Sequence, residues 1–114
     1  MTTRIILADD HIIMREGLKK IIEHELKLNV VAQASDGRTT VEHVREHHPD
    51  IVIMDIGMPG LNGIEATRII KQEFPDVKVI ALSMHTERNI VADMLSAGAS
   101  AYLLKDSAPD ELGL

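Results

Sequence analysis

The feature that most constrains this chain is an alternation of short apolar runs with longer amphipathic stretches, which repeats about five times along its 114 residues. Short runs that are aliphatic or β-branched throughout are typical of strands buried on both faces of a sheet. Amphipathic stretches between such runs are typical of helices that connect parallel strands. The pattern predicts one α/β domain with strands at about 4–8, 29–34, 51–54, 77–82 and 101–104.

The first two connecting stretches carry helix signals. After the first strand, apolar residues recur at the spacing of a single helical face, namely Met14, Leu18, Ile21 and Ile22. A second helix is expected over about 37–47, because Asp36 is a favourable residue for opening it. Pro49 then marks the return to the third strand.

Two further helices are predicted in the second half of the chain. Asn62 followed by Glu65 resembles a capping box, and the helix that it opens should end near Phe74. The next helix should begin after Thr86 and stop at Gly98. The residues expected to face the sheet are Ile90, Val91, Met94 and Leu95.

Composition excludes several classes of protein. The net charge is −6 with no basic stripe, so we do not expect this segment to bind nucleic acid directly. The only aromatic residues, Phe74 and Tyr102, offer no stacking platform for single strands. Cysteine is absent, which excludes disulfides and thiolate metal sites. With no secretory leader and no apolar run of membrane-spanning length, a cytoplasmic location and no membrane partner are expected.

Three aspartates follow two of the predicted strands. Asp9 and Asp10 end the first apolar run, and Asp55 ends the third. In open parallel sheets the carboxyl ends of the strands line the binding crevice, so these side chains should share one cleft. Carboxylates packed this closely raise one another's pKa and repel, whereas a hard divalent cation accepts their oxygens as ligands. The sequence therefore predicts a Mg²⁺ site.

Four short motifs follow one another along the chain, namely Ala8–His11, Met54–Gly60, Ala81–Ser83 and Ala99–Asp106. Through these motifs nearly the whole chain resembles a response regulator receiver domain with the flavodoxin-like fold of CheY. Each is weak by itself, but their order and spacing together are specific. The first and the last are most similar to receivers that precede a helix-turn-helix DNA-binding domain in regulators of the nitrate-responsive type.

The resemblance implies a role for each site residue. Asp55 would accept a phosphoryl group, Lys105 and Ser83 would contact its oxygens, and Tyr102 would change rotamer as the domain switches. The implied ligands of Mg²⁺, or of Mn²⁺, are Asp9, Asp10, Asp55 and the backbone carbonyl of Gly57. Such a domain is a phosphoacceptor that assists its own phosphoryl transfer and hydrolysis, and it is not counted as an enzyme.

The resemblance also implies partners in a two-component phosphorelay. A sensor histidine kinase would supply the phosphoryl group, and a C-terminal helix-turn-helix domain would regulate transcription. Residues 1–114 are then a receiver domain cut from a longer protein, and its fifth helix, begun at 109–112, is truncated or absent. The resemblance further implies that such a receiver can pair with a second copy of itself as a homodimer.

Two other functions compete with this interpretation. One is a phosphorylation-independent adaptor that binds a partner through the face of the fourth helix. It is disfavoured because every expected site residue is present. The other is a metal-dependent phosphohydrolase. It is disfavoured because the chain has no inserted cap, and because Gly57 stands two residues after Asp55, where haloacid-dehalogenase-like enzymes have a second acid.

A histidine cluster in the second helix offers a different metal hypothesis. His43 and His47 are four residues apart, a spacing that zinc sites use, and His48 follows. No acidic third ligand is obvious nearby. We therefore interpret the cluster as a solvated helix end.

Overall fold

The computed structural model describes residues 3–83 and 88–104. These residues contain a five-stranded parallel sheet in the order β2-β1-β3-β4-β5. The strands are β1 (Arg4–Ala8), β2 (Asn29–Ala34), β3 (Ile51–Asp55), β4 (Lys78–Ser83) and β5 (Ala101–Leu104). This strand order is that of the flavodoxin-like, doubly wound fold, as predicted.

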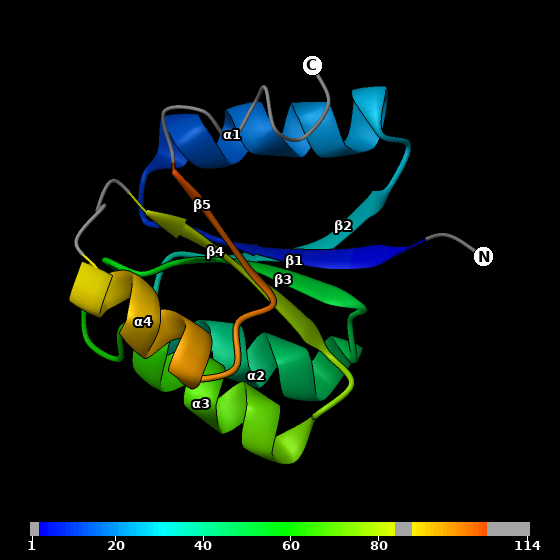
Figure 1. Ribbon diagram of the computed structural model, residues 1–114. Helices are drawn as coiled ribbons and strands as arrows, with labels where there is room; N and C mark the ends of the chain where they lie inside the picture. The colour runs from blue at the N-terminus through cyan, green and yellow to red at the C-terminus, as the bar shows by residue number, and fades with distance from the viewer. Residues whose placement is uncertain (1–2, 84–87, 105–114) are drawn as a thin grey trace.

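Helices cover both faces of the sheet, with α1 on one side and α2, α3 and α4 on the other (Figure 1). Their bounds are α1 (Ile12–Lys20), α2 (Gly37–His47), α3 (Gly63–Glu73) and α4 (Arg88–Ser96). A π-helical turn, η1 (Ile21–Glu25), extends α1. None of the helices in the described part of the chain is both long and apolar enough to cross a membrane.

The sheet divides the apolar interior into two cores. Ile5 and Leu7 of β1 pack with Leu18 and Ile22 on the α1 side. Alternate residues of the same strand, such as Ile6, pack on the opposite side under α2, α3 and α4. This two-sided burial is why β1 reads as a continuous apolar run rather than an alternating one.

The prediction that every strand is buried on both sides holds only in part for the outer strands, which contact the cores on both faces of the sheet but are incompletely buried. Apart from Ala34, β2 is half-buried or exposed, and all of β5 is half-buried. Both strands lie at an edge of the sheet, where a neighbouring strand covers one side only. The central strands β1 and β3 are buried except at their first residues, as predicted.

The predicted helix starts of α2 and α3 are confirmed. The Asp36 carboxylate accepts the Thr39 N–H at 2.7 Å, and the Asn62 side chain accepts the Glu65 N–H at 3.0 Å. Only half of the capping box forms, because the Glu65 carboxylate accepts a hydrogen bond from Arg68 at 2.7 Å instead of reaching back to Asn62. Polar side chains therefore fix where both helices begin.

The face of α4 differs in part from the prediction. Met94 is fully buried and Ile90 packs against the core, but Leu95 is 46% exposed. Neighbouring helical residues point about 100° apart, so Met94 and Leu95 cannot both face the sheet. Gly98 ends the helix region with φ at +117°, as predicted. The predicted start after Thr86 and the fifth helix at 109–112 lie outside the described residues.

Candidate functional site

The parallel pairing of β1 with β3 brings the aspartates together. Ala8 pairs with Met54, so the next residues, Asp9 and Asp55, lie side by side at the carboxyl ends of β1 and β3. One ligand atom from each member of a four-residue cluster lies within 4.8 Å of the others, and the members are Asp9, Asp10, His11 and Asp55. The predicted meeting of the three carboxylates is confirmed.

Burial differs sharply among these carboxylates. Asp9 is fully buried and Asp55 is 3% exposed, whereas the Asp10 side chain is 32% exposed. A buried carboxylate is costly unless its charge is compensated by a counter-charge or hydrogen bonds. The cluster is therefore accessible to solvent on the Asp10 side and closed on the Asp9 side.

His11 is a site residue to which the sequence assigned no role. Its Nδ1 lies 3.0 Å from Oδ1 of Asp9, 3.2 Å from Oδ1 of Asp10 and 4.0 Å from Oδ2 of Asp55. Its backbone N–H donates to Oδ1 of Asp9 at 2.8 Å. A protonated His11 would offset part of the negative charge, and a neutral one would add a nitrogen ligand.

Arg15 supports the buried end of the cluster. Its Nη1 donates to the Asp9 carbonyl at 2.8 Å, and its Nε donates to Oε1 of Gln33 at 3.1 Å. The Asp9 N–H donates in turn to the Ala34 carbonyl. These bonds tie the start of α1 to the ends of β1 and β2, a role that helical periodicity alone does not reveal.

The loop after β3 orients Asp55. The Gly57 N–H donates to Oδ1 of Asp55 at 3.2 Å, and the Gly63 N–H donates to the Ile56 carbonyl at 3.1 Å. A β-carbon on Gly63 would lie 2.4 Å from the Asp55 carbonyl oxygen, so α3 approaches this loop as closely as only glycine allows. The part of the Gly57 carbonyl in metal binding stays a prediction.

Ser83 lies on β4, the strand next to Asp55, and Tyr102 lies on β5, one strand further toward the edge of the sheet. Asp55 pairs with Leu82, so Ser83 is one residue beyond it at the end of β4, and its side chain is buried. Tyr102 is half-buried on β5 and packs against the larger core. Lys105 lies outside the described residues. Of the two predicted phosphate-contacting side chains, the structure describes Ser83 alone and places it on the strand next to Asp55, and its contact with a phosphoryl oxygen stays a prediction.

The donor set suits a hard divalent cation. Carboxylate oxygens are the ligands that Mg²⁺ and Mn²⁺ prefer, and Mg²⁺ needs few protein ligands because it keeps several waters. Asp9, Asp10 and Asp55 supply such oxygens within one cluster, and the cluster is open to water at Asp10. This acidic pocket could therefore bind Mg²⁺.

Comparison with protein families and curated proteins agrees with this geometry. Residues 5–113 match the family described as the response regulator receiver domain. The chain is 47% identical over 109 residues to the transcriptional regulatory protein DegU of Brevibacillus brevis, covering 96% of this chain and 46% of DegU. It is 43% identical over 108 residues to the response regulator UvrY of Escherichia coli K12, and the match covers 95% of this chain and 50% of UvrY. The chain thus spans about half the length of these relatives.

Solved structures show the same fold. A LuxR-family two-component response regulator from Aurantimonas superposes with a TM-score of 0.91 at 43% identity, covering 98% of this chain and 80% of that one. The receiver domain of the putative regulator NarL from Mycobacterium tuberculosis superposes with a TM-score of 0.92 at 33% identity. This match covers 97% of this chain and 90% of that one. The comparisons do not favour a phosphorylation-independent adaptor over a receiver. On this evidence the chain belongs to the response regulator receiver domain family of two-component signalling proteins.

Proposed function

We propose that Asp55 accepts a phosphoryl group from the phosphohistidine of a sensor kinase. The observation that supports this most directly is the convergence of three carboxylates from the ends of adjacent strands, with ligand atoms within 4.8 Å. An Asp55 oxygen forms a bond to phosphorus as the phosphorus–nitrogen bond breaks, and the released imidazole keeps the electron pair and takes up a proton. Carboxylates act as nucleophiles in such transfers when the group is positioned and its charge is offset.

The residues around Asp55 would hold and orient the incoming group. The Gly57 N–H fixes one carboxylate oxygen of Asp55, which limits its rotation. Ser83 would donate its hydroxyl to a phosphoryl oxygen, and Lys105 would contribute a positive charge. Asp9, Asp10, Asp55 and the Gly57 carbonyl would hold Mg²⁺ or Mn²⁺. A bound cation would supply charge neutralisation to the phosphoryl oxygens.

Tyr102 connects this chemistry to a signal. It pairs with Ala81 on the adjacent strand β4, two residues before Ser83, and its half-buried side chain packs against the core. When Ser83 turns toward a phosphoryl oxygen, we expect the β4–α4 surface to move and Tyr102 to become more buried. This shift would signal to a C-terminal helix-turn-helix domain that regulates transcription, in a cytoplasmic protein of about twice this length. A homodimer of the receiver stays a prediction.

Intact-mass spectrometry after incubation with acetyl phosphate tests the chemistry. We expect one phosphoryl adduct in the presence of Mg²⁺, little with EDTA, and none in Asp55→Asn. Asp76→Asn is the matched control, since Asp76 is an exposed aspartate outside the acidic cluster. An adduct that persists in Asp55→Asn, or a folded wild-type chain that forms none, would overturn the proposal.

A further inference from the structure

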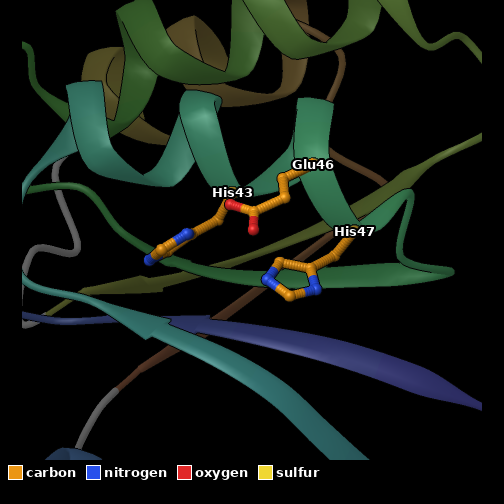
Figure 2. Close-up of side chains that lie close together, drawn as sticks. All are labelled: His43, Glu46 and His47. Atoms are coloured by element: carbon orange, nitrogen blue, oxygen red, sulfur yellow. The ribbon is translucent and has the colours of Figure 1, made fainter.

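A second group of metal-binding side chains lies on the last turns of α2. His43, Glu46 and His47 each offer one ligand atom, and these three atoms lie within 4.8 Å of one another. Figure 2 shows the side chains on the same side of the helix, with the Glu46 carboxylate between the two imidazole rings. The group is separate from the acidic cluster, because α2 ends beside Arg4 at the opposite end of β1.

The helix itself produces this arrangement. Residues three and four apart lie on one helical face, so His43, Glu46 and His47 are neighbours whenever α2 forms. The imidazole centroids are 5.8 Å apart with an angle of 62° between the rings. The interpretation as a solvated helix end assumed that no acidic third ligand was near, and Glu46 corrects that assumption. The same order, His-x-x-Glu-His, occurs on the zinc helix of a class of metallopeptidases, in which the two histidines bind the metal and the glutamate is the general base.

The surroundings hold the helix but leave the ligands accessible. Val44 is fully buried and anchors this turn, and Arg4 donates to the carbonyls of His47 and His48 at its end. Arg45 forms a two-point ion pair with Glu73 of α3, in which Nε donates to Oε1 at 2.8 Å and Nη2 donates to Oε2 at 2.6 Å. The Arg45 cation is therefore held by α3, while the ligand side chains remain half-buried or exposed.

We propose that His43, Glu46 and His47 bind a transition-metal ion of the Zn²⁺ class. One nitrogen of each imidazole and one Glu46 oxygen provide three protein ligands, and water completes a tetrahedral set. The three donor atoms lie within 4.8 Å of one another, so a bound ion would draw them together through rotations of their side chains. Imidazole nitrogens favour Zn²⁺, Ni²⁺ or Cu²⁺ over Mg²⁺, so this site selects a different ion from the acidic cluster. A divalent ion is also favourable near the carboxyl end of a helix.

The bound ion stabilises the end of α2. It clamps two successive turns, and any ion that binds only the folded chain raises the free energy of unfolding. The proposal needs no phosphorylation, so it holds or fails independently of the role of Asp55. All three ligands come from α2, and no other helix or strand in the described part of the chain contributes one. We therefore assign metal binding to this site and no hydrolytic activity.

Calorimetric titration of the chain with ZnCl₂, in excess Mg²⁺ to occupy the acidic cluster, tests the site. We expect one ion per chain and at least about a tenfold loss of affinity in His43→Ala and His47→Ala. Glu46→Gln should also weaken binding. The matched controls are His24→Ala, an exposed histidine on η1, and Glu42→Gln, an exposed glutamate on α2, and both should bind as the wild type does.

NMR of the wild-type histidines gives an answer that does not depend on the folding of any variant. Zn²⁺ should shift the imidazole signals of His43 and His47 and leave those of His24 unchanged. Shifts at His11 would place the ion in the acidic cluster and overturn the proposal. So would equal shifts at all histidines, no response at all, or a double His43→Ala/His47→Ala variant that binds Zn²⁺ as tightly as the wild type.

Discussion

At the scale of single residues, Gly63 decides how closely α3 approaches the strand that carries Asp55. A β-carbon there would lie 2.4 Å from the Asp55 carbonyl oxygen and 2.8 Å from the Ile56 Cα. Both are backbone atoms, so the loop would have to move. We expect Gly63→Ala to lower the free energy of unfolding by about 1–3 kcal/mol and to slow adduct formation at Asp55. Urea unfolding and mass spectrometry measure the two effects.

Gly17 provides the matched control for this substitution. It lies within α1, and nothing comes within 4 Å of a β-carbon built there. Gly17→Ala should therefore stabilise the chain by about 0.5–1 kcal/mol, because alanine favours the helix. If Gly63→Ala were as stable as Gly17→Ala, the close approach of α3 would not be a constraint.

The aspartates were predictable and the other contacts of the site were not. Asp9 and Asp55 end strands, and in a parallel sheet that position alone determines where they meet. The contacts of His11 and Arg15 depend on the geometry of the turn after β1. This turn places the His11 ring beside the Asp9 carboxylate and the Arg15 guanidinium beside the Asp9 carbonyl. Hydrophobic periodicity describes buried faces, so it carries no signal for such polar contacts.

At the scale of elements, Asp36 is the clearest test of local structure. The N–H and hydroxyl of Thr39 both donate to its carboxylate, and these bonds hold the pKa of Asp36 below its usual value. We expect Asp36→Ala to lower the free energy of unfolding by about 1 kcal/mol at neutral pH. Ser35→Ala, an exposed neighbour, should have little effect. Urea unfolding of both variants checks this.

The pH dependence of this cap follows from the direction of the shift. Because the folded pKa is lower than the unfolded one, the contribution is complete above the ordinary value of 3.8 and is lost as pH falls through the folded value. The gap between wild type and Asp36→Ala should therefore be constant from pH 7 to about 5 and narrow below pH 4. A gap that widens on acidification would contradict the assigned hydrogen bonds.

The order and type of the elements followed from the sequence, but two details did not. The π-helical turn at Ile21–Glu25 keeps Ile22 buried while the backbone widens, and a 3.6-residue period cannot show that change. Leu95 and Met94 are adjacent apolar residues, and only packing decides which one faces the sheet. Such choices depend on tertiary contacts, which a pattern in one segment does not contain.

At the scale of the whole molecule, burial predicts how stability is distributed. The central strands β1 and β3 are nearly fully buried, whereas the edge strand β5 is half-buried throughout. Amide hydrogens of buried central strands exchange with solvent only through global unfolding, whereas those of more exposed elements exchange through local unfolding. We expect hydrogen exchange measured by NMR to be slowest in β1 and β3 and faster in β5. Equal protection of β5 and β1 would contradict this distribution.

The acidic cluster should also make stability depend on divalent cations. The chain carries a net charge of −6, and three carboxylates lie at one end of its sheet. Removing one of them by Asp10→Asn relieves repulsion, so without divalent cations this variant should unfold at a higher temperature than the wild type. Adding Mg²⁺ should raise the wild-type midpoint and leave Asp10→Asn nearly unchanged.

Thermal unfolding in EDTA and in Mg²⁺ measures both effects. When the Mg²⁺ concentration is one hundred times the dissociation constant, binding to the folded state alone adds about 2.7 kcal/mol to the free energy of unfolding. This is enough to make the wild type unfold at a higher temperature than Asp10→Asn. Asp76→Asn removes the same charge from an exposed position and separates local repulsion from net charge. If the unfolding midpoint of Asp76→Asn in EDTA rose as much as that of Asp10→Asn, the change in net charge alone would explain the effect. If both variants kept the full response to Mg²⁺, Asp10 would not be a ligand.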